Sequence, residues 1–259
     1  MNILIQEIVN SVLALGPSVF WVFLRVGASM ALLPVFAEQV VSMRFRLAAT
    51  VGFTILVWPL IKDQFPEITT DAEFLQVGGA EIIAGLLLGL SFRLFVHALQ
   101  IAGTIAGSST SLAQVFGGGV GVDPQPAIGN TLVLGALALA AMTGLHVRVT
   151  EAFLLSYDAI PAGHWPQPDF VKDWTIREVG QAFSLAFVLS APFLVAALLY
   201  NLALGVINRA MPQLMVSFVG APALTLGGLV IGAISLPFLL IVWNTLFQNA
   251  LSDPFGMGY

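Results

Sequence analysis

The 259-residue chain contains no cysteine and very little charge. Without cysteine it can hold neither a disulfide framework nor a thiolate metal site. Charged residues make up 9% of the chain and hydrophobic residues 58%, whereas soluble domains carry about 25% charged residues. The mean hydropathy is +0.94. A folded chain with so little polar surface needs lipid or other protein around it, so the sequence predicts a membrane protein.

Basic and catalytic residues are scarce as well. The nine Lys and Arg form no basic run and the net charge is −5, so we expect no nucleic-acid partner. The three histidines, His97, His146 and His164, do not have metal-ligand spacing. The serines at 108, 109 and 111 lack a G-x-S-x-G context. Because no acid, base, nucleophile or metal set converges, we expect no enzymatic activity, no metal and no cofactor.

The apolar residues form continuous runs, which indicates helices rather than the alternating strands of a membrane β-barrel. Six runs stand between the charged stretches, at about 8–33, 47–61, 74–107, 127–147, 179–207 and 223–247. A spanning helix needs roughly 20 apolar residues, so the second run is short. We expect a solvated loop at 62–73 and a polar stretch at 148–178. The sequence predicts an all-α polytopic membrane protein with about six long apolar helices in one domain, 1–259.

The positive-inside rule does not orient these six runs. Alternate loops would collect Arg44, Arg46 and Arg209 on one side of the membrane. The other side would collect four basic residues, namely Lys62, Arg148, Lys172 and Arg177. This near tie leaves two interpretations: the number of spans differs from six, or partner proteins hold the chain in place of ordinary bilayer insertion.

Glycines recur at a spacing that suits close helix packing. Three pairs stand four residues apart within apolar runs: Gly85 with Gly89, Gly103 with Gly107, and Gly228 with Gly232. Residues at this spacing share one helix face, where glycine lets another backbone approach closely. We expect these pairs to pack against helices of this chain or of another subunit.

Three charged residues, Arg25, Glu81 and Arg93, interrupt apolar runs. Such groups usually face a protein interior or water, because their exposure to lipid is unfavourable. Glu81 and Arg93 are roughly 18 Å apart along one helix, too far to pair. Glu81 can instead pair with Arg25 or with a partner subunit. An assembly contact is favoured over a proton relay, which normally needs several aligned carboxylates or histidines.

A glycine-rich segment follows the third apolar run. Its residues are Val115, Phe116, Gly117, Gly118, Gly119, Val120, Gly121, Val122, Asp123 and Pro124. It matches neither a P-loop nor a dinucleotide-binding turn. Irregular backbone at membrane depth is tolerated only inside protein or along a cavity. Apolar groups exclude water and ions, and glycines let a segment move, so the composition suits a plug in a conduit; the alternative is an ordinary surface loop.

Four stretches resemble the flagellar biosynthetic protein R (FliR) family and its injectisome counterparts. The most specific is "NLALGVINRAMPQLMVSFVGAP", Asn201 to Pro222. A second is "LRVGASMALLPVFAEQ", followed by Arg44 and Arg46. The third runs from Glu81 through the first two glycine pairs to Asp123-Pro124. The fourth is Gly144 and His146, then "SYDAIPAG". Together they cover nearly the whole chain in order.

The resemblance implies a subunit of a helical protein-export gate in the bacterial inner membrane, at the flagellar basal body. Implied partners are the export-gate subunits P and Q, the export-switch B subunit, the A subunit, basal-body ring and rod proteins, membrane lipid, and unfolded secreted proteins in transit. It also implies two parts: residues 1–178 would be P-like, with a plug loop near 108–126, and 179–259 would be a Q-like helical hairpin.

Residue roles carried by the resemblance are expectations of the same kind. The segment 115–124 would be the pore plug. Asn208, Arg209, Pro212 and Gln213 would form the entrance turn of the Q-like hairpin. Arg25, Arg44, Arg46 and Glu81 would contact other subunits. Alternatives to the flagellar gate are the equivalent injectisome subunit, a small-solute transporter or channel, a membrane enzyme, and a scaffold without a conduit role.

Overall fold

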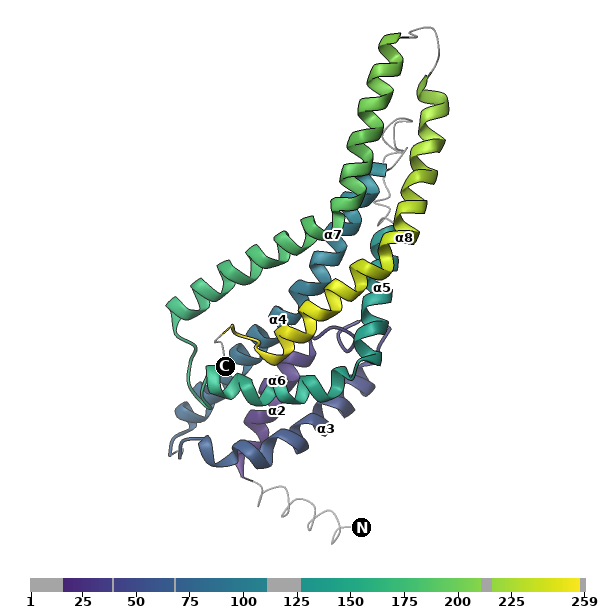
Figure 1. Ribbon diagram of the computed structural model, residues 1–259. Coiled ribbons are helices and arrows are strands. Elements are labelled where there is room, and N and C mark those ends of the chain that lie inside the picture. Colours follow the sequence, from purple (N-terminus) through teal and green to yellow (C-terminus); the bar gives the residue numbers. More distant parts are fainter. Residues whose placement is uncertain (1–15, 39, 68, 111–126, 211–215, 257–259) are drawn as a thin grey trace. The chain divides into compact units, whose positions relative to one another are not determined.

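The structure, a computed structural model, describes residues 16–38, 40–67, 69–110, 127–210 and 216–256, with the backbone alone at 110, 127 and 216–225. These residues form helices and contain no strand (Figure 1). The elements are α2 (Pro17–Met30), α3 (Met43–Ile61), η1 (Lys62–Gln64), α4 (Asp71–Thr110), α5 (Ala127–Met142), α6 (Leu145–Ala159), α7 (Pro168–Ala210) and α8 (Val216–Ser252). The predicted all-α fold is confirmed.

Local sequence signals fix several helix starts. Pro17 opens α2, where its missing N–H has no helical partner to lose. The Ser42 side chain caps α3 by accepting from the Phe45 amide at 3.4 Å. Thr70 and Glu73 form a reciprocal capping box at α4, because the Thr70 hydroxyl accepts from the Glu73 amide and the Glu73 carboxylate accepts from the Thr70 amide.

One helix lies where the sequence suggested only a polar stretch. Helix α6 occupies 145–159 and is amphipathic: Val149, Phe153 and Tyr157 are buried, whereas Arg148 and Glu151 are exposed. It follows a break at Gly144, which adopts a φ of 84° that favours glycine. The charged face of α6 lowers its mean hydropathy, which is why a search for apolar runs does not find it.

Four helical stretches of the described chain are long and apolar enough to cross a membrane: Met43–Gln64, Asp71–Ser109, Pro168–Ala210 and Leu226–Ser252. A fifth results if α5 and α6, which are broken at Thr143 and Gly144, count as one bent span. The predicted number of six was therefore approximate. Helix α2 has 14 residues, too few to cross the hydrocarbon core of about 30 Å alone.

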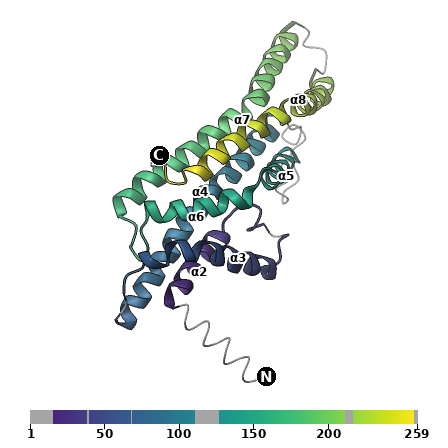
Figure 2. The same cartoon turned by 60° about the horizontal axis from the view of Figure 1, so that its bottom comes forward.

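The chain divides into two compact units, each built from separate stretches of sequence. Unit 1 comprises residues 1–94, 141–178 and 247–259. Its helices α2 and α3 lie side by side in both views of the ribbon (Figures 1 and 2), and α3 also contacts α6. Its core contains many large side chains that are almost completely buried, among them Trp21, Phe92, Phe153, Trp174 and Phe255.

Unit 2 comprises residues 95–140 and 179–246. Its helices pack through small residues: a Cβ on Gly103 of α4 would overlap the backbone of Gly129 on α5. The indole of Trp243 on α8 is fully buried and donates to the Phe95 carbonyl at 2.9 Å. Much of α7 and α8 carries exposed leucine, valine and phenylalanine side chains.

Candidate functional site

A buried ion pair lies in unit 1, between α2 and α4. The guanidinium of Arg25 donates from Nε to Glu81 Oε2 at 2.7 Å and from Nη2 to Glu81 Oε1 at 3.0 Å. Both side chains are completely buried. The two parallel bonds use the planar fork of arginine, which matches a carboxylate in a way that lysine cannot. Of the two pairings open to Glu81, the structure shows the one within the chain.

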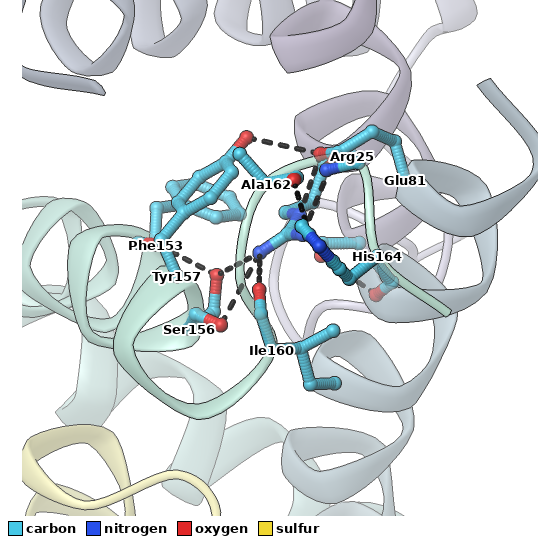
Figure 3. A network of polar contacts seen from close by, with 11 residues as sticks. Arg25, Glu81, Phe153, Ser156, Tyr157, Ile160, Ala162 and His164 are labelled. Atoms are coloured by element: carbon cyan, nitrogen blue, oxygen red, sulfur yellow. Dashed lines mark hydrogen bonds and ion pairs between the residues drawn. The ribbon is translucent and has the colours of Figure 1, made fainter. Parts of the chain in front are cut away.

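The C-terminal end of α6 completes the network around this pair (Figure 3). The Nη1 group of Arg25 points away from Glu81 and donates to the Ser156 carbonyl at 3.2 Å and the Ile160 carbonyl at 3.0 Å. Glu81 also accepts from the Tyr157 hydroxyl at 3.2 Å and the Gly163 amide at 2.8 Å. The Arg25 guanidinium carbon lies 3.7 Å from the centre of the Tyr157 ring. The network therefore joins α2, α4, α6 and the segment that follows α6.

The charges of this network balance and its hydrogen-bonding groups are used. Glu81 accepts four hydrogen bonds, two at each oxygen, and Arg25 donates from all three guanidinium nitrogens. Burial of an ion pair is tolerated when such bonds satisfy both partners, but removal of one partner is strongly destabilising. The arrangement suits fixing of helices rather than proton transfer, because its only carboxylate is fully bonded.

Glycines bring α2 close enough to α4 for this pairing. A Cβ on Gly85 would overlap the Arg25 carbonyl oxygen, and one on Gly89 would lie 2.7 Å from the Ser29 carbonyl oxygen. The Ser29 hydroxyl in turn donates to the Gly85 carbonyl at 2.7 Å. Both contacts are with backbone, which cannot move aside as a side chain can. These two glycines set the distance between the helices that carry Arg25 and Glu81.

A pocket of about 370 Å³ lies on the segment between α6 and α7. Its lining includes Ile160, Pro161, His164, Trp165 and Phe170. The segment that the ion-pair network contacts thus also forms the pocket wall. In the part of the chain that the structure describes, no group of three or more His, Asp or Glu side chains could hold a metal ion.

A second ion pair in unit 1 is half-buried. Arg93 on α4 donates to Glu38 at 2.7 Å. Glu38 lies in the α2–α3 connection, where Arg46 donates from Nε to the Phe36 carbonyl at 3.0 Å. Val35, just before Phe36, adopts a φ of 72°, which is strained for a β-branched residue. Two arginines therefore hold a connection whose backbone stores strain.

The structure places the remaining expected site residues as follows. Arg25 and Glu81 are buried and paired with each other, and their expected contact with other subunits stays a prediction. Arg44, Asn208 and Arg209 are exposed, and Arg46 is half-buried. Gly107 lies on α4, and Gly228 lies on α8. A Cβ on Gly232 would make ordinary contact with Phe193 at 3.6 Å. The plug segment 115–124, Pro212 and Gln213 lie outside the described residues.

Sequence reasoning did not find several members of the network. Tyr157, Ser156 and Gly163 belong to the quoted "SYDAIPAG" string, but their contact with Arg25 and Glu81 was not anticipated. The signal that was available is the amphipathic pattern of α6, whose buried face carries the tyrosine. Ile160 and Gly163 contribute a backbone carbonyl and a backbone amide. Because every residue type has a carbonyl and nearly every one an amide, their identities did not indicate these contacts.

Fold and site together define a class: an all-helical, multi-span membrane protein whose buried charges are paired within the chain. The model of the family described as "Bacterial export proteins, family 1" matches residues 17–250. The chain belongs to this family of bacterial export proteins.

Individual relatives agree along most of their length. The flagellar biosynthetic protein FliR of Caulobacter vibrioides is 30% identical over 234 residues, which cover 89% of this chain and 92% of that protein. FliR of Bacillus subtilis is 28% identical over 224 residues, covering 82% and 83%. The Yop proteins translocation protein T of Yersinia pestis is 28% identical over 208 residues, covering 76% and 77%.

Proposed function

We propose that this chain is a subunit of the flagellar type III protein export gate and helps to form the conduit for unfolded flagellar proteins. The observation that carries the proposal is the family match over 17–250, together with flagellar relatives that align with most of the chain. The expected result of gene loss is failure of rod and basal-body assembly, because the subunit would belong to the gate from which the rod is built.

The dimensions of the apolar helices support a role inside a larger assembly. Helix α7 has 43 residues and α8 has 37, which correspond to about 65 Å and 55 Å at 1.5 Å per residue. The hydrocarbon core of a bilayer is only about 30 Å thick. Half of the most apolar stretch of α4 is buried within the chain, against 17% for α8. The hydrocarbon core cannot cover the full length of α8, so we expect apolar surfaces of other proteins to cover the rest.

The partners of this assembly are the export-gate subunits P and Q, followed by the B and A subunits and the basal-body ring and rod proteins. The site of action is the bacterial inner membrane at the flagellar basal body. Within the chain, 1–178 corresponds to a P-like part and 179–259 to a Q-like hairpin. The boundary between Glu178 and Val179 is also one at which the two compact units separate, although each unit is discontinuous in sequence.

The plug assignment for 115–124 rests on the family resemblance and on the composition of this segment. Deletion of 115–121 is expected to raise the leak of ions or small molecules through the assembled gate without blocking assembly. The measurement is the influx of a small impermeant solute into cells that hold the gate. An unchanged leak would remove the plug assignment while leaving the gate proposal standing.

The gate proposal is tested by deletion of the gene in its source bacterium. We expect loss of motility and absence of hook and filament proteins from the medium, with both restored by a plasmid-borne copy. Affinity-tagged chain is expected to carry the P and Q subunits through purification in mild detergent. Normal export in the deletion strain would overturn the proposal.

The similarity to the Yop proteins translocation protein T favours one alternative, an equivalent subunit of an injectisome. The same deletion separates the two functions. Loss of secreted virulence proteins with normal swimming would assign the chain to an injectisome. Loss of swimming with normal virulence secretion would assign it to the flagellum.

A further inference from the structure

We propose that Arg25 and Glu81 are positioning residues that hold the α6–α7 connection, residues 160–167, and thereby fix the start of α7. The contacts that carry this inference are directed at the connection from both members of the pair. Arg25 donates to the Ile160 carbonyl at 3.0 Å, and Glu81 accepts from the Gly163 amide at 2.8 Å. Only the consequence for export rests on the proposed function.

The Arg25 contact replaces bonds that the end of a helix lacks. The last carbonyls of a helix have no partner within it, and a positive group nearby also interacts favourably with the helix dipole. Ile160 is the C-terminal cap of α6, with extended backbone angles, and its carbonyl is directed at Nη1 of Arg25. The same nitrogen bonds the Ser156 carbonyl one turn earlier. Pro161 cannot continue the helix, since it has no N–H, and Arg25 binds the Ile160 carbonyl at the point where α6 ends.

The Glu81 contact holds the turn that comes next. Gly163 has a φ of 73°, in the left-handed region, and a Cβ there would lie 3.1 Å from Pro66 and 3.3 Å from Val77. Its amide is bound by the Glu81 carboxylate. Ala162, just before it, is 1% exposed. The chain thus makes a tight turn against α4, and the buried carboxylate is the group that binds the amide at that turn.

The geometry favours positioning over general stabilisation. A buried ion pair is weak evidence for stability, because apolar residues of similar size often do as well. Here, however, the pair binds two backbone groups of the connection, the Ile160 carbonyl and the Gly163 amide, and a third, the Ser156 carbonyl, in the last turn of α6. An apolar pair could fill the space but could bind none of these atoms. The connection, rather than the helices, is what should loosen in its absence.

The absence of cysteine makes a direct test possible, because one introduced thiol reports on one place. Ala162→Cys reports on the connection, and Ala152→Cys, at a completely buried position of α6, is the matched control. Each is placed in the full-length chain in native membranes, and the rate of maleimide labelling is measured. Both thiols are expected to label slowly when Arg25 and Glu81 are present.

The decisive background is Arg25→Met with Glu81→Leu, which removes both charges together and leaves neither buried alone. We expect labelling at 162 to rise about tenfold or more, as for local opening of a segment, with labelling at 152 unchanged. Arg25→Lys, which keeps the charge without the fork, is expected to give an intermediate rate at 162. Protection of both thiols in the double variant would overturn the inference. An equal rise at both positions would overturn it too, because the pair would then support unit 1 as a whole.

The labelling result does not depend on what the chain exports. If the gate proposal fails, the thiol at 162 still reports whether the pair holds the connection. If the gate proposal holds, the double variant without added cysteines is expected to assemble with its partners and to secrete less flagellar protein. Full secretion together with raised labelling at 162 would remove the consequence for export and leave the positioning role.

Discussion

The two units of the molecule differ most in where their charge lies. The stretches that form unit 2 contain only Asp123 and Arg209 as charged residues, and all others belong to unit 1. Unit 1 pairs its buried charges internally, as Arg25 and Glu81 do without exposure. In unit 2, α7 and α8 expose many large apolar side chains, including Leu198, Leu202 and Ile234, as α3 of unit 1 also does at Met43 and Leu60.

This difference indicates that the helices of the two units are held in place by different kinds of contact. In unit 1, the directional hydrogen bonds of the buried ion pair fix the positions of the helices. A buried carboxylate tolerates few arrangements of its donors. Unit 2 packs mainly through small residues and apolar side chains. The polar bonds of unit 1 suit a region whose helices keep fixed positions. The apolar surface of unit 2 suits contact with lipid or with other apolar helices.

The largest expected effect concerns the buried pair. Arg25→Met alone should destabilise unit 1 by about 3–5 kcal/mol, because it leaves the Glu81 carboxylate buried without its cation. SDS titration of detergent-solubilised chain, followed by tryptophan fluorescence, measures the change. The double change with Glu81→Leu should recover most of the loss. A single variant as stable as the parent would mean that unit 1 does not depend on its charges, and the contrast with unit 2 would disappear.

Helix contacts through glycine should be equally strict in both units. Gly85→Ala in unit 1 and Gly103→Ala in unit 2 place a Cβ against backbone, and each should lower the free energy of unfolding by about 1–3 kcal/mol through overpacking. Gly52→Ala and Gly205→Ala are the matched helical controls, since a Cβ there meets nothing within 4 Å. These should gain about 0.5–1 kcal/mol from helix propensity. A neutral Gly103→Ala beside a damaging Gly85→Ala would show that unit 2 packs more loosely.

The strained turn of unit 1 offers a gain in stability. Val35→Gly should raise the free energy of unfolding by about 1 kcal/mol, because glycine adopts the φ of 72° without steric conflict. The midpoint of the same SDS titration detects the shift, and Ala37→Gly, in the same connection, controls for the added chain entropy. If Val35→Gly destabilised the chain as much as Ala37→Gly does, the turn would not be strained.

The smallest effect is expected at the second ion pair. Arg93 and Glu38 remain 22% and 29% exposed, so water and salt weaken their attraction, and Glu38→Gln should destabilise by about 0–1 kcal/mol. Repeating the titration at high salt should reduce that difference further. If Glu38→Gln lowered the free energy of unfolding as much as Arg25→Met does, the ion pair at the α2–α3 connection would stabilise unit 1 as much as the buried pair does.

How much of the fold was predictable depends on the composition of each helix. Helix α8 and the apolar parts of α4 and α7 follow from long runs with little charge, and α3 follows from a shorter run at 47–61. Helix α6 was missed because Arg148, Glu151 and Asp158 on its outer face hide the buried face. Pattern searches for membrane helices favour uniform hydrophobicity, and a half-buried helix within a membrane protein does not have it.

The candidate site was only half predictable for a different reason. Arg25 and Glu81 are conspicuous as charges within apolar runs, but 55 residues separate them along the chain. Whether they meet depends on how α2 packs on α4, which the sequence does not state. Their remaining partners are mostly backbone atoms, and any residue type can supply those. The sequence did not predict the left-handed φ of Val35 either, because valine normally avoids that region.

The central claim, which rests on the proposed function, is that export-gate partners cover the exposed apolar side chains of α7 and α8 in unit 2 but not those of α3 in unit 1. Single cysteines at Leu198 and Leu202 in unit 2, and at Met43 and Leu60 in unit 1, all replace exposed side chains. Maleimide labelling of the purified chain, alone and in complex with the P and Q subunits, compares them directly. We expect partners to slow labelling at 198 and 202 by about tenfold or more while leaving 43 and 60 nearly unchanged, as burial of an apolar interface requires. Equal labelling at 198 and 202 with and without partners would contradict the account.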